Sequence, residues 1–297
     1  MSDLQFEQVA NIKVFGIGGG GCNAVNRMVS EGVKGVGFYV ANTDLQALNI
    51  SPVENKIVLG REVTKGLGAG ANPEMGRRAA QENENEIREA IKGSDMVFIT
   101  TGLGGGTGTG AAPMFAKIAK EEGALTVGIV TKPFTFEGKK RMKSAEDGLA
   151  ELKQYVDSLI IVSNNNLIEV IGRRPLTEAF QAADNVLRQG VQTITDLIAV
   201  PALINLDFAD VRTIMENQGS ALIGIGMAEG EDKARAAAEK AIQSPLLEAQ
   251  ITGASNAIVN ITGGESITLF DAEDAMALVR EAAGNDIDAI FGVAINE

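Results

Sequence analysis

The sequence has no histidine and only one cysteine, Cys22. Histidine is the commonest general base and the commonest metal ligand, so its absence all but excludes a catalytic zinc site or a Ser-His-Asp triad. Carboxylates, lysines, arginines, hydroxyls and backbone amides must then carry any chemistry. A single cysteine excludes an internal disulfide framework and fits a reducing compartment.

Basic residues are also scarce. The 26 Lys and Arg against 39 Asp and Glu give a net charge of −13. Such a chain lacks the clustered cations that bind polyanions, so we expect no nucleic acid partner and no anionic membrane. It has no apolar run long enough to span a bilayer, and its polar N-terminus is neither a signal nor a transit peptide. We therefore expect a cytoplasmic protein without direct membrane insertion.

The chain does have enough apolar residues, 45% of 297, for a sizeable core in one large or two modest domains. In its first half, apolar β-branched runs alternate with helical patterns. This alternation is typical of an α/β fold in which helices cover both faces of a parallel sheet. The predicted strands are residues 12–17, 36–40, 56–59, 96–100, 126–130 and 159–162, and the predicted helices are 23–31, 72–92, 111–121 and 141–155.

The second half opens with a long predicted helix at about residues 177–199, which carries one apolar stripe. Elements then resume as a smaller α/β pattern. Its predicted helices are 208–216, 233–243 and 272–283, and its predicted strands are 221–227, 257–262 and 289–295. We expect a flexible N-terminal segment at 1–10, a nucleotide-type domain at 11–175, a central connecting helix at 176–200 and a C-terminal domain at 201–297.

Three glycine-rich segments, residues 16–21, 66–72 and 102–110, follow or lie near the carboxyl ends of predicted strands. The first matches Gly-x-Gly-x-x-Gly, and alone it fits a dinucleotide site with Asp44 on the ribose, a phosphate loop, or a ligand-free turn about equally well. Three such loops on one sheet edge favour a triphosphate. The segment 102–110 lacks the lysine of a P-loop, so backbone amides would form the cradle, helped by the hydroxyls of Thr107 and Thr109.

The long helix carries a carboxylate, Asp184, on its apolar stripe, four residues after Phe180. A charge there is costly without a partner. One carboxylate can accept both the ring N–H and the exocyclic amine of guanine, and Phe180 can stack on a purine. The alternative is that Phe180 belongs to the core and Asp184 pairs with Arg188, and the sequence alone favours this alternative.

Two further charged segments have open interpretations. The basic segment at residues 136–141 either brings Arg141 to phosphate oxygens or forms a solvated basic face. Asp207 and Asp210 either cap and stabilise a helix start, or orient a water molecule and hold a divalent cation near a phosphate. Sequence spacing does not choose between these alternatives.

Taken together, these segments resemble the FtsZ family of bacterial tubulin-like cell-division GTPases. Residues 104–110 are similar to the tubulin-type glycine signature, residues 205–210 are similar to the family's synergy loop, and the similarity runs over residues 12–291. The lack of a Walker lysine and of an Asn-Lys-x-Asp motif agrees with it. The resemblance implies a tubulin-like fold, in which a Rossmann-type parallel sheet forms a GTP-binding domain and a long central helix joins it to a smaller α/β domain.

The resemblance also implies a site for GTP or GDP, with Mg²⁺ whose ligands it does not assign. Residues 18–21, 69–72 and 104–107 would surround the phosphates, Glu137 and Arg141 the ribose and phosphates, and Asn164, Phe180 and Asp184 the guanine. The full nucleotide set is Gly18, Gly19, Gly20, Gly21, Asn23, Ala69, Gly70, Ala71, Gly102, Gly104, Gly105, Gly106, Thr107, Gly108, Thr131, Pro133, Glu137, Arg141, Asn164, Phe180 and Asp184.

In this family the nucleotide pocket is completed by a neighbouring subunit. Asn205, Asp207 and Asp210 of one subunit would enter the pocket of the next in a head-to-tail filament, so hydrolysis would depend on polymerisation. The implied partners are further copies of the chain and division proteins that bind the family's C-terminal tail, and the implied location is the mid-cell division ring.

The family's globular region usually continues beyond the segment that corresponds to residues 291–296, so we expect the smaller domain to be truncated. Two alternatives remain at the level of the sequence. One is a nucleotide-binding assembly protein without turnover, and the other is a nicotinamide-dependent oxidoreductase that uses the first glycine loop.

Overall fold

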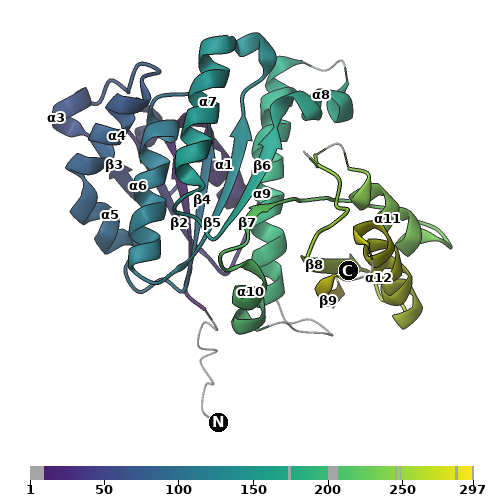
Figure 1. Ribbon diagram of the computed structural model, residues 1–297. Helices are drawn as coiled ribbons and strands as arrows, with labels where there is room; N and C mark the ends of the chain where they lie inside the picture. Colours follow the sequence, from purple (N-terminus) through teal and green to yellow (C-terminus); the bar gives the residue numbers. More distant parts are fainter. Residues whose placement is uncertain are drawn as a thin grey trace. The chain divides into compact units, whose positions relative to one another are not determined.

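The computed structural model describes residues 10–172, 175–199, 207–244, 246–247, 249–284 and 287–295 (Figure 1). The segment expected to be flexible, residues 1–10, lies outside this range except for residue 10. The chain forms two compact units: the first comprises residues up to Gln192 together with residues 216–221, and the second comprises Thr193–Met215 and the residues from Leu222 onward. Each unit is described separately below.

A parallel sheet forms the first unit, as the alternation of strands and helices predicts. Its strand order is β3-β2-β1-β4-β5-β6-β7, and every neighbouring pair among the described residues is parallel. The strands are β1 (Ile12–Ile17), β2 (Gly37–Asn42), β3 (Asn55–Val58), β4 (Met96–Gly102), β5 (Leu125–Lys132), β6 (Ser158–Ser163) and β7 (Gly219–Ala221). Because all strands run the same way, the loops that leave their carboxyl ends share one edge.

Helices cover this sheet and alternate with its strands (Figure 1). They are α1 (Gly18–Ser30), α2 (Leu45–Ile50), α3 (Arg61–Thr64), α4 (Pro73–Glu82), α5 (Glu84–Ile91), α6 (Thr107–Glu121), α7 (Lys139–Leu152) and α8 (Asn164–Ile171), with a 3-10 turn, η1, at Thr135–Glu137. Helix α9 (Leu176–Ala199) belongs to this unit up to Gln192 and to the second unit from Thr193. Phe15 of β1 links the layers, since its ring stacks on Tyr39 at 4.7 Å and meets Phe115 of α6 at 5.6 Å.

Three of the predicted helices differ in detail. The single helix expected at 72–92 is two helices, because Asn83 leaves the helical conformation and its Oδ1 accepts a hydrogen bond from Gly60 N at 2.8 Å. Helices α1 and α6 begin inside the glycine runs, at Gly18 and Thr107, several residues earlier than expected. The glycine runs are therefore partly first turns of helices rather than wholly loops.

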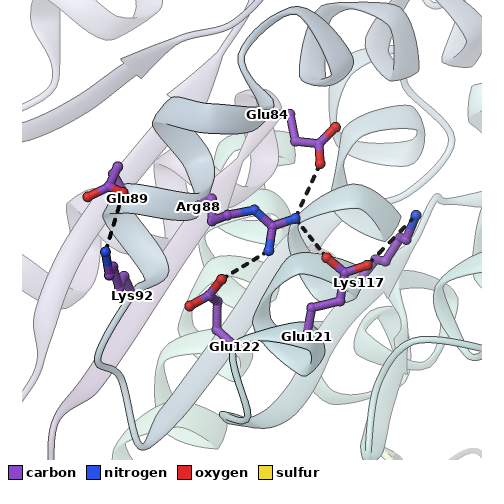
Figure 2. A network of polar contacts seen from close by, with 7 residues as sticks. All are labelled: Glu84, Arg88, Glu89, Lys92, Lys117, Glu121 and Glu122. Atoms are coloured by element: carbon purple, nitrogen blue, oxygen red, sulfur yellow. Dashed lines mark hydrogen bonds and ion pairs between the residues drawn. The ribbon is translucent and has the colours of Figure 1, made fainter.

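An ion-pair network ties α5 to the end of α6 (Figure 2). The guanidinium of Arg88 contacts Glu84 at 3.2 Å, Glu121 at 2.7 Å and Glu122 at 2.9 Å. These three carboxylates raise the pKa of Arg88 above its ordinary value. Since one side chain serves three partners, the entropy of ordering it is shared among the contacts.

The second unit contains a parallel pair of strands and three further helices among its described residues. They are α10 (Phe208–Met215), α11 (Lys233–Ile242), α12 (Leu269–Ala283), β8 (Asn256–Gly263) and β9 (Asp288–Ile295), and α11 packs on α12. Helix α12 begins three residues earlier than expected because Thr268 and Asp271 form a capping box at its start. No helix in the described part of the chain is long and apolar enough to cross a membrane.

The prediction of a strand at residues 221–227 is wrong. The chain forms only the short strand β7, which joins β6 in the large sheet, and residues 222–229 form no regular element. Gly224 and Gly226 explain the difference, because a Cβ on either would lie 2.1 Å or less from a carbonyl oxygen of α11. The segment lies against a helix backbone instead of pairing with a strand.

Candidate functional site

Two glycine segments meet at the carboxyl edge of the large sheet. Gly18 starts α1 with a left-handed φ of +70°, and a Cβ there would lie 2.7 Å from the backbone N of Gly108 in α6. A Cβ on Gly20 would lie 3.2 Å from the N of Gly102. Backbone therefore touches backbone between the β1–α1 and β4–α6 connections, and only glycine permits this approach.

The third glycine segment joins the same edge. A Cβ on Gly106 would lie 2.8 Å from Ala69 Cβ and 2.8 Å from Asn72 N. In addition, the hydroxyls of Thr43 and Thr107 are 2.6 Å apart, both residues being buried. The structure thus brings together the three segments that the sequence singled out.

Two helix N-termini face this edge. Neither α1, which starts at Gly18, nor α6, which starts at Thr107, has a side-chain cap among the described residues. Their first amides and the positive ends of their dipoles are suited to an anion. A Cβ on Gly19 or Gly105 would meet no described atom within 4 Å, so open space adjoins both residues.

The β4–α6 connection is held by a hydrogen bond within the segment and by contacts with neighbouring residues. Thr109, which the sequence offered as a ligand donor, is buried and its Oγ1 accepts a hydrogen bond from Gly104 N at 2.8 Å. A Cβ on Gly104, whose φ is +95°, would lie 2.7 Å from the Arg141 carbonyl oxygen and 3.3 Å from Pro133. Thr131 also adjoins, since its carbonyl accepts from Leu103 N at 2.9 Å.

The basic segment beside this connection is ordered by Glu137. One oxygen of its carboxylate accepts a hydrogen bond from Phe134 N at 2.9 Å, and the other contacts Arg141 Nε at 3.0 Å. The Arg141 side chain remains 48% exposed. Glu137 thus orders the guanidinium of Arg141, and part of the arginine side chain stays open to a ligand.

Asn164 lies at the first turn of α8, directly after β6, and is 5% exposed. Its side-chain oxygen accepts no hydrogen bond from the described residues. A buried polar atom without a partner is uncommon and costs free energy, which is consistent with a ligand donor at this position.

Phe180 is 41% exposed on α9 and so is not simply a core residue. Its ring meets Phe134 edge-on at 5.4 Å, and Phe134 stacks on Phe136 at 5.1 Å. This arrangement fixes the ring of Phe180 and leaves part of its surface free for stacking.

Asp184, one turn further along α9, is partly buried. Burial raises its pKa to about 6, and the positive charge of Arg27 only partly opposes this effect. The expected partner Arg188 contacts Glu31 at 3.1 Å and Asn185 at 2.9 Å instead. The carboxylate therefore has the unfavourable environment that a donor pair from a ligand would relieve.

Asp44, the residue considered for a ribose, has a local role in the structure. Asp44 caps α2, accepting hydrogen bonds from Gln46 N at 2.9 Å and Ala47 N at 3.2 Å. This removes the main support for a ribose-binding acid in a dinucleotide site. Asn23 is exposed on α1.

Asp207 and Asp210 form a reciprocal capping box at the start of α10. Asp210 N donates to Asp207 Oδ1 at 2.8 Å, and Asp207 N donates to Asp210 Oδ2 at 3.2 Å. Both residues are exposed. The capping interpretation is therefore correct, and the second oxygen of each carboxylate remains available for another role. The third expected residue of this segment, Asn205, lies outside the described residues.

Sequence reasoning missed Thr43, whose hydroxyl pairs with that of Thr107. Its position carried a usable signal, because it directly follows β2 and so lies at the same sheet edge as the glycine segments.

Comparison with known proteins identifies the families that the chain matches. Residues 11–172 match the model of the Tubulin/FtsZ family, GTPase domain, and residues 219–297 match that of the FtsZ family, C-terminal domain. A structure described as an empty FtsZ dimer from M. jannaschii is 46% identical, with 99% of this chain and 85% of that chain covered and a TM-score of 0.94.

A second M. jannaschii structure, of an FtsZ W319Y mutant, is also 46% identical, covering 97% of this chain and 87% of that chain, with a TM-score of 0.93. CetZ2 from Haloferax volcanii, described as a GTPγS-bound protofilament, is 20% identical, covering 96% of this chain and 90% of that chain, with a TM-score of 0.81. At this identity the last similarity shows the fold alone.

Proposed function

The chain belongs to the tubulin/FtsZ family, and on this premise we propose that it binds and hydrolyses GTP, polymerises head to tail, and forms the division ring in bacterial cytokinesis. The observation that carries the proposal is the meeting of three glycine segments and two uncapped helix N-termini at one sheet edge. That arrangement suits a triphosphate better than the single pyrophosphate of a dinucleotide.

The phosphates would lie against the amides at the starts of α1 and α6. Open space adjoins Gly19 and Gly105, the backbone of Arg141 adjoins Gly104, and the Arg141 guanidinium is ordered by Glu137. These donors are fixed before a ligand arrives, so charge that develops on the phosphate during hydrolysis is stabilised without reorganisation.

Asp184, Asn164 and Phe180 would read the base. The carboxylate of Asp184 can accept the ring N–H and the exocyclic amine of guanine, and Phe180 offers a ring face. The Asn164 oxygen, without a donor among the described residues, offers a further acceptor. Adenine presents no such pair of donors, so this set favours GTP over ATP.

Asn205, Asp207 and Asp210 of the next subunit would complete the site. The capping box uses one oxygen of each aspartate, and the second oxygens can accept the protons of an attacking water. No histidine is present to act as a base. A heterologous head-to-tail contact that does not close generates a filament, and here it would also complete the catalytic site.

Several finer features belong to the same proposal. Mg²⁺ would be held chiefly by the nucleotide's phosphate oxygens and would neutralise part of their charge. The protein would act in the cytoplasm at the mid-cell ring, where division proteins bind the C-terminal tail of this family. The alternative is assembly with bound nucleotide but without turnover.

The test measures GTP-dependent sedimentation and phosphate release in the same samples over a range of protein concentrations. We expect activity per molecule to rise with concentration in parallel with the sedimented fraction, and GTP, unlike ATP or NAD, to raise the melting temperature. Sedimentation without phosphate release would support the alternative. Stabilisation by NAD alone would refute the proposal.

A further inference from the structure

The carboxylate of Asp157, which is 3% exposed, lies where β5, β6 and β7 begin. Its Oδ2 accepts a hydrogen bond from Thr126 N at 2.9 Å. Its Oδ1 accepts from Lys120 Nζ at 2.5 Å and from Asn217 N at 3.2 Å. A buried charge is tolerated only when it is compensated in this way, so the positions of all these groups are coupled.

Asn217 is held at its side chain as well as at its backbone. Its Oδ1 accepts from Lys120 Nζ at 2.8 Å, and its φ of +56° is left-handed, a conformation that asparagine tolerates. Two residues later, Gly219 N donates to the Asp157 carbonyl at 2.8 Å and begins β7. We call Lys120, Asp157 and Asn217 the clamp.

The clamp contacts none of the nucleotide segments, yet the chain connects it to both halves of the proposed active site. Helix α6 starts at Thr107, in the phosphate cradle, and Lys120 is its penultimate residue. Helix α10 starts directly after Asp207, carries Asp210 in its first turn and ends at Met215, two residues before Asn217. The Arg88 network fixes the same end of α6 to α5 (Figure 2).

We propose that the clamp is a positioning device for GTP hydrolysis, which anchors the end of α10 so that Asp207 and Asp210 are presented to the nucleotide of the next subunit in a reactive geometry. This inference rests on the proposed function. Lys120, Asp157 and Asn217 are positioning residues, since none of them would touch GTP. Their loss would slow hydrolysis of the neighbour's nucleotide and spare the subunit's own nucleotide binding.

The variant Lys120→Met tests this, because it removes the ammonium and keeps most of the aliphatic stem. Lys117→Met, on the same helix, is the matched control: the side chain of Lys117 is 51% exposed and its ammonium lies 3.9 Å from the carboxylate of Glu121. Asn217→Gly is the second variant, which removes the Oδ1 acceptor and tolerates the left-handed backbone. Circular dichroism and the GTP dissociation constant establish that each variant is folded.

Misplacing a catalytic group by about 1 Å costs on the order of a hundredfold in rate, so we expect kcat to fall between about tenfold and a hundredfold in both clamp variants. The GTP dissociation constants of the two clamp variants should stay within about twofold of the value for the unmodified protein. The activity of the control, Lys117→Met, should also stay within about twofold of that of the unmodified protein. A structural defect of the nucleotide pocket would instead weaken GTP binding together with kcat.

Mixing two variants shows whether the defect lies in the subunit that binds GTP or in the subunit that supplies the aspartates. Gly105→Ser supplies an intact α10 but fills the open space proposed for a phosphate. Added to Lys120→Met it should restore turnover, because its aspartates serve the clamp variant's bound GTP. A mixture of Lys120→Met and Asp210→Asn should show no recovery of turnover, because Asp210→Asn lacks the acid and Lys120→Met would misplace it.

The outcomes separate the two proposals. If the unmodified protein shows no concentration-dependent turnover, the proposed function fails and the clamp's role fails with it. If the unmodified protein is active and both clamp variants keep their kcat, or if Lys120→Met complements Asp210→Asn, only the clamp inference is refuted.

Discussion

Lowering the pH should weaken GTP binding through Asp184. Burial raises the pKa of this carboxyl to about 6, with Arg27 opposing the effect only in part. Guanine presents two N–H donors, which require the ionised carboxylate as acceptor. Protonation therefore removes the partner of the base at a pH where an ordinary aspartate would still be charged.

The size of the effect follows from this pKa of about 6. Nearly all Asp184 is ionised at about pH 7.5, but only about a tenth is ionised at about pH 5. If only the ionised form binds guanine, the apparent dissociation constant rises about tenfold over this range, because the competent fraction falls by that factor.

The same carboxylate should affect the stability of the nucleotide-free protein with the opposite sign. Its pKa is about 6 in the folded protein against an ordinary value of 3.8, so folding favours the protonated form. At about 1.36 kcal/mol per pKa unit, the ionised group destabilises the fold by about 3 kcal/mol above pH 6. This destabilisation is progressively relieved as the pH falls from about 6 towards 3.8.

Calorimetric titration of GTP at several pH values, with the unmodified protein and with Asp184→Asn, measures the binding effect. The terminal phosphate of GTP titrates in the same range, and the variant supplies that baseline because it retains the phosphate site. Asp184→Asn should bind GTP more weakly at neutral pH and melt at a higher temperature without nucleotide. Identical pH dependence in the two proteins would refute the assignment of Asp184 to guanine.

Three further predictions concern the phosphate site, the acids and the fold. Asp210→Asn should keep GTP binding, since the amide oxygen of the new side chain can still cap α10, but its rate of phosphate release should fall about a hundredfold or more. Equal losses of GTP binding and phosphate release would contradict a catalytic role for Asp210. Gly104→Ala should weaken GTP binding far more than Gly123→Ala. Both glycines have a positive φ, but only at Gly104 would the added Cβ clash, since it would lie 2.7 Å from the Arg141 carbonyl oxygen. Similar GTP dissociation constants for the two variants would contradict this prediction. Arg88→Met should lower the melting temperature, and the difference should shrink at about 1 M salt; a salt-independent difference would exclude an electrostatic origin.

Much of the sheet could be predicted from the sequence, because most of its buried parallel strands are apolar, β-branched runs separated by helical patterns. The glycine segments at 16–21 and 102–110 were recognisable from the sequence as well. What periodicity could not supply was the break at Asn83, which depends on a long-range bond to Gly60. Nor could it supply the register of β7, which depends on the buried carboxylate of Asp157.

The candidate site was predictable in outline and not in the role of each side chain. Thr109 and Asp44 have the right chemistry for ligand contacts, but nearby backbone amides take their acceptors. Helical spacing alone favoured a pair between Asp184 and Arg188 as the alternative to a guanine contact, yet Glu31 of α1 contacts that arginine instead. Such competition among partners is a property of tertiary packing, which spacing along one helix does not contain.

In the proposed filament, one subunit supplies the phosphate cradle and the next subunit supplies the acids. Phosphate release from an equimolar mixture of Asp210→Asn and Gly105→Ser tests this division of roles, with sedimentation of the same sample as proof of copolymerisation. Each variant alone should be nearly inactive, and the mixture should recover activity towards the limit set by random assembly, in which about a quarter of the contacts are complete. A mixture that sediments together and stays inactive would contradict this division of roles.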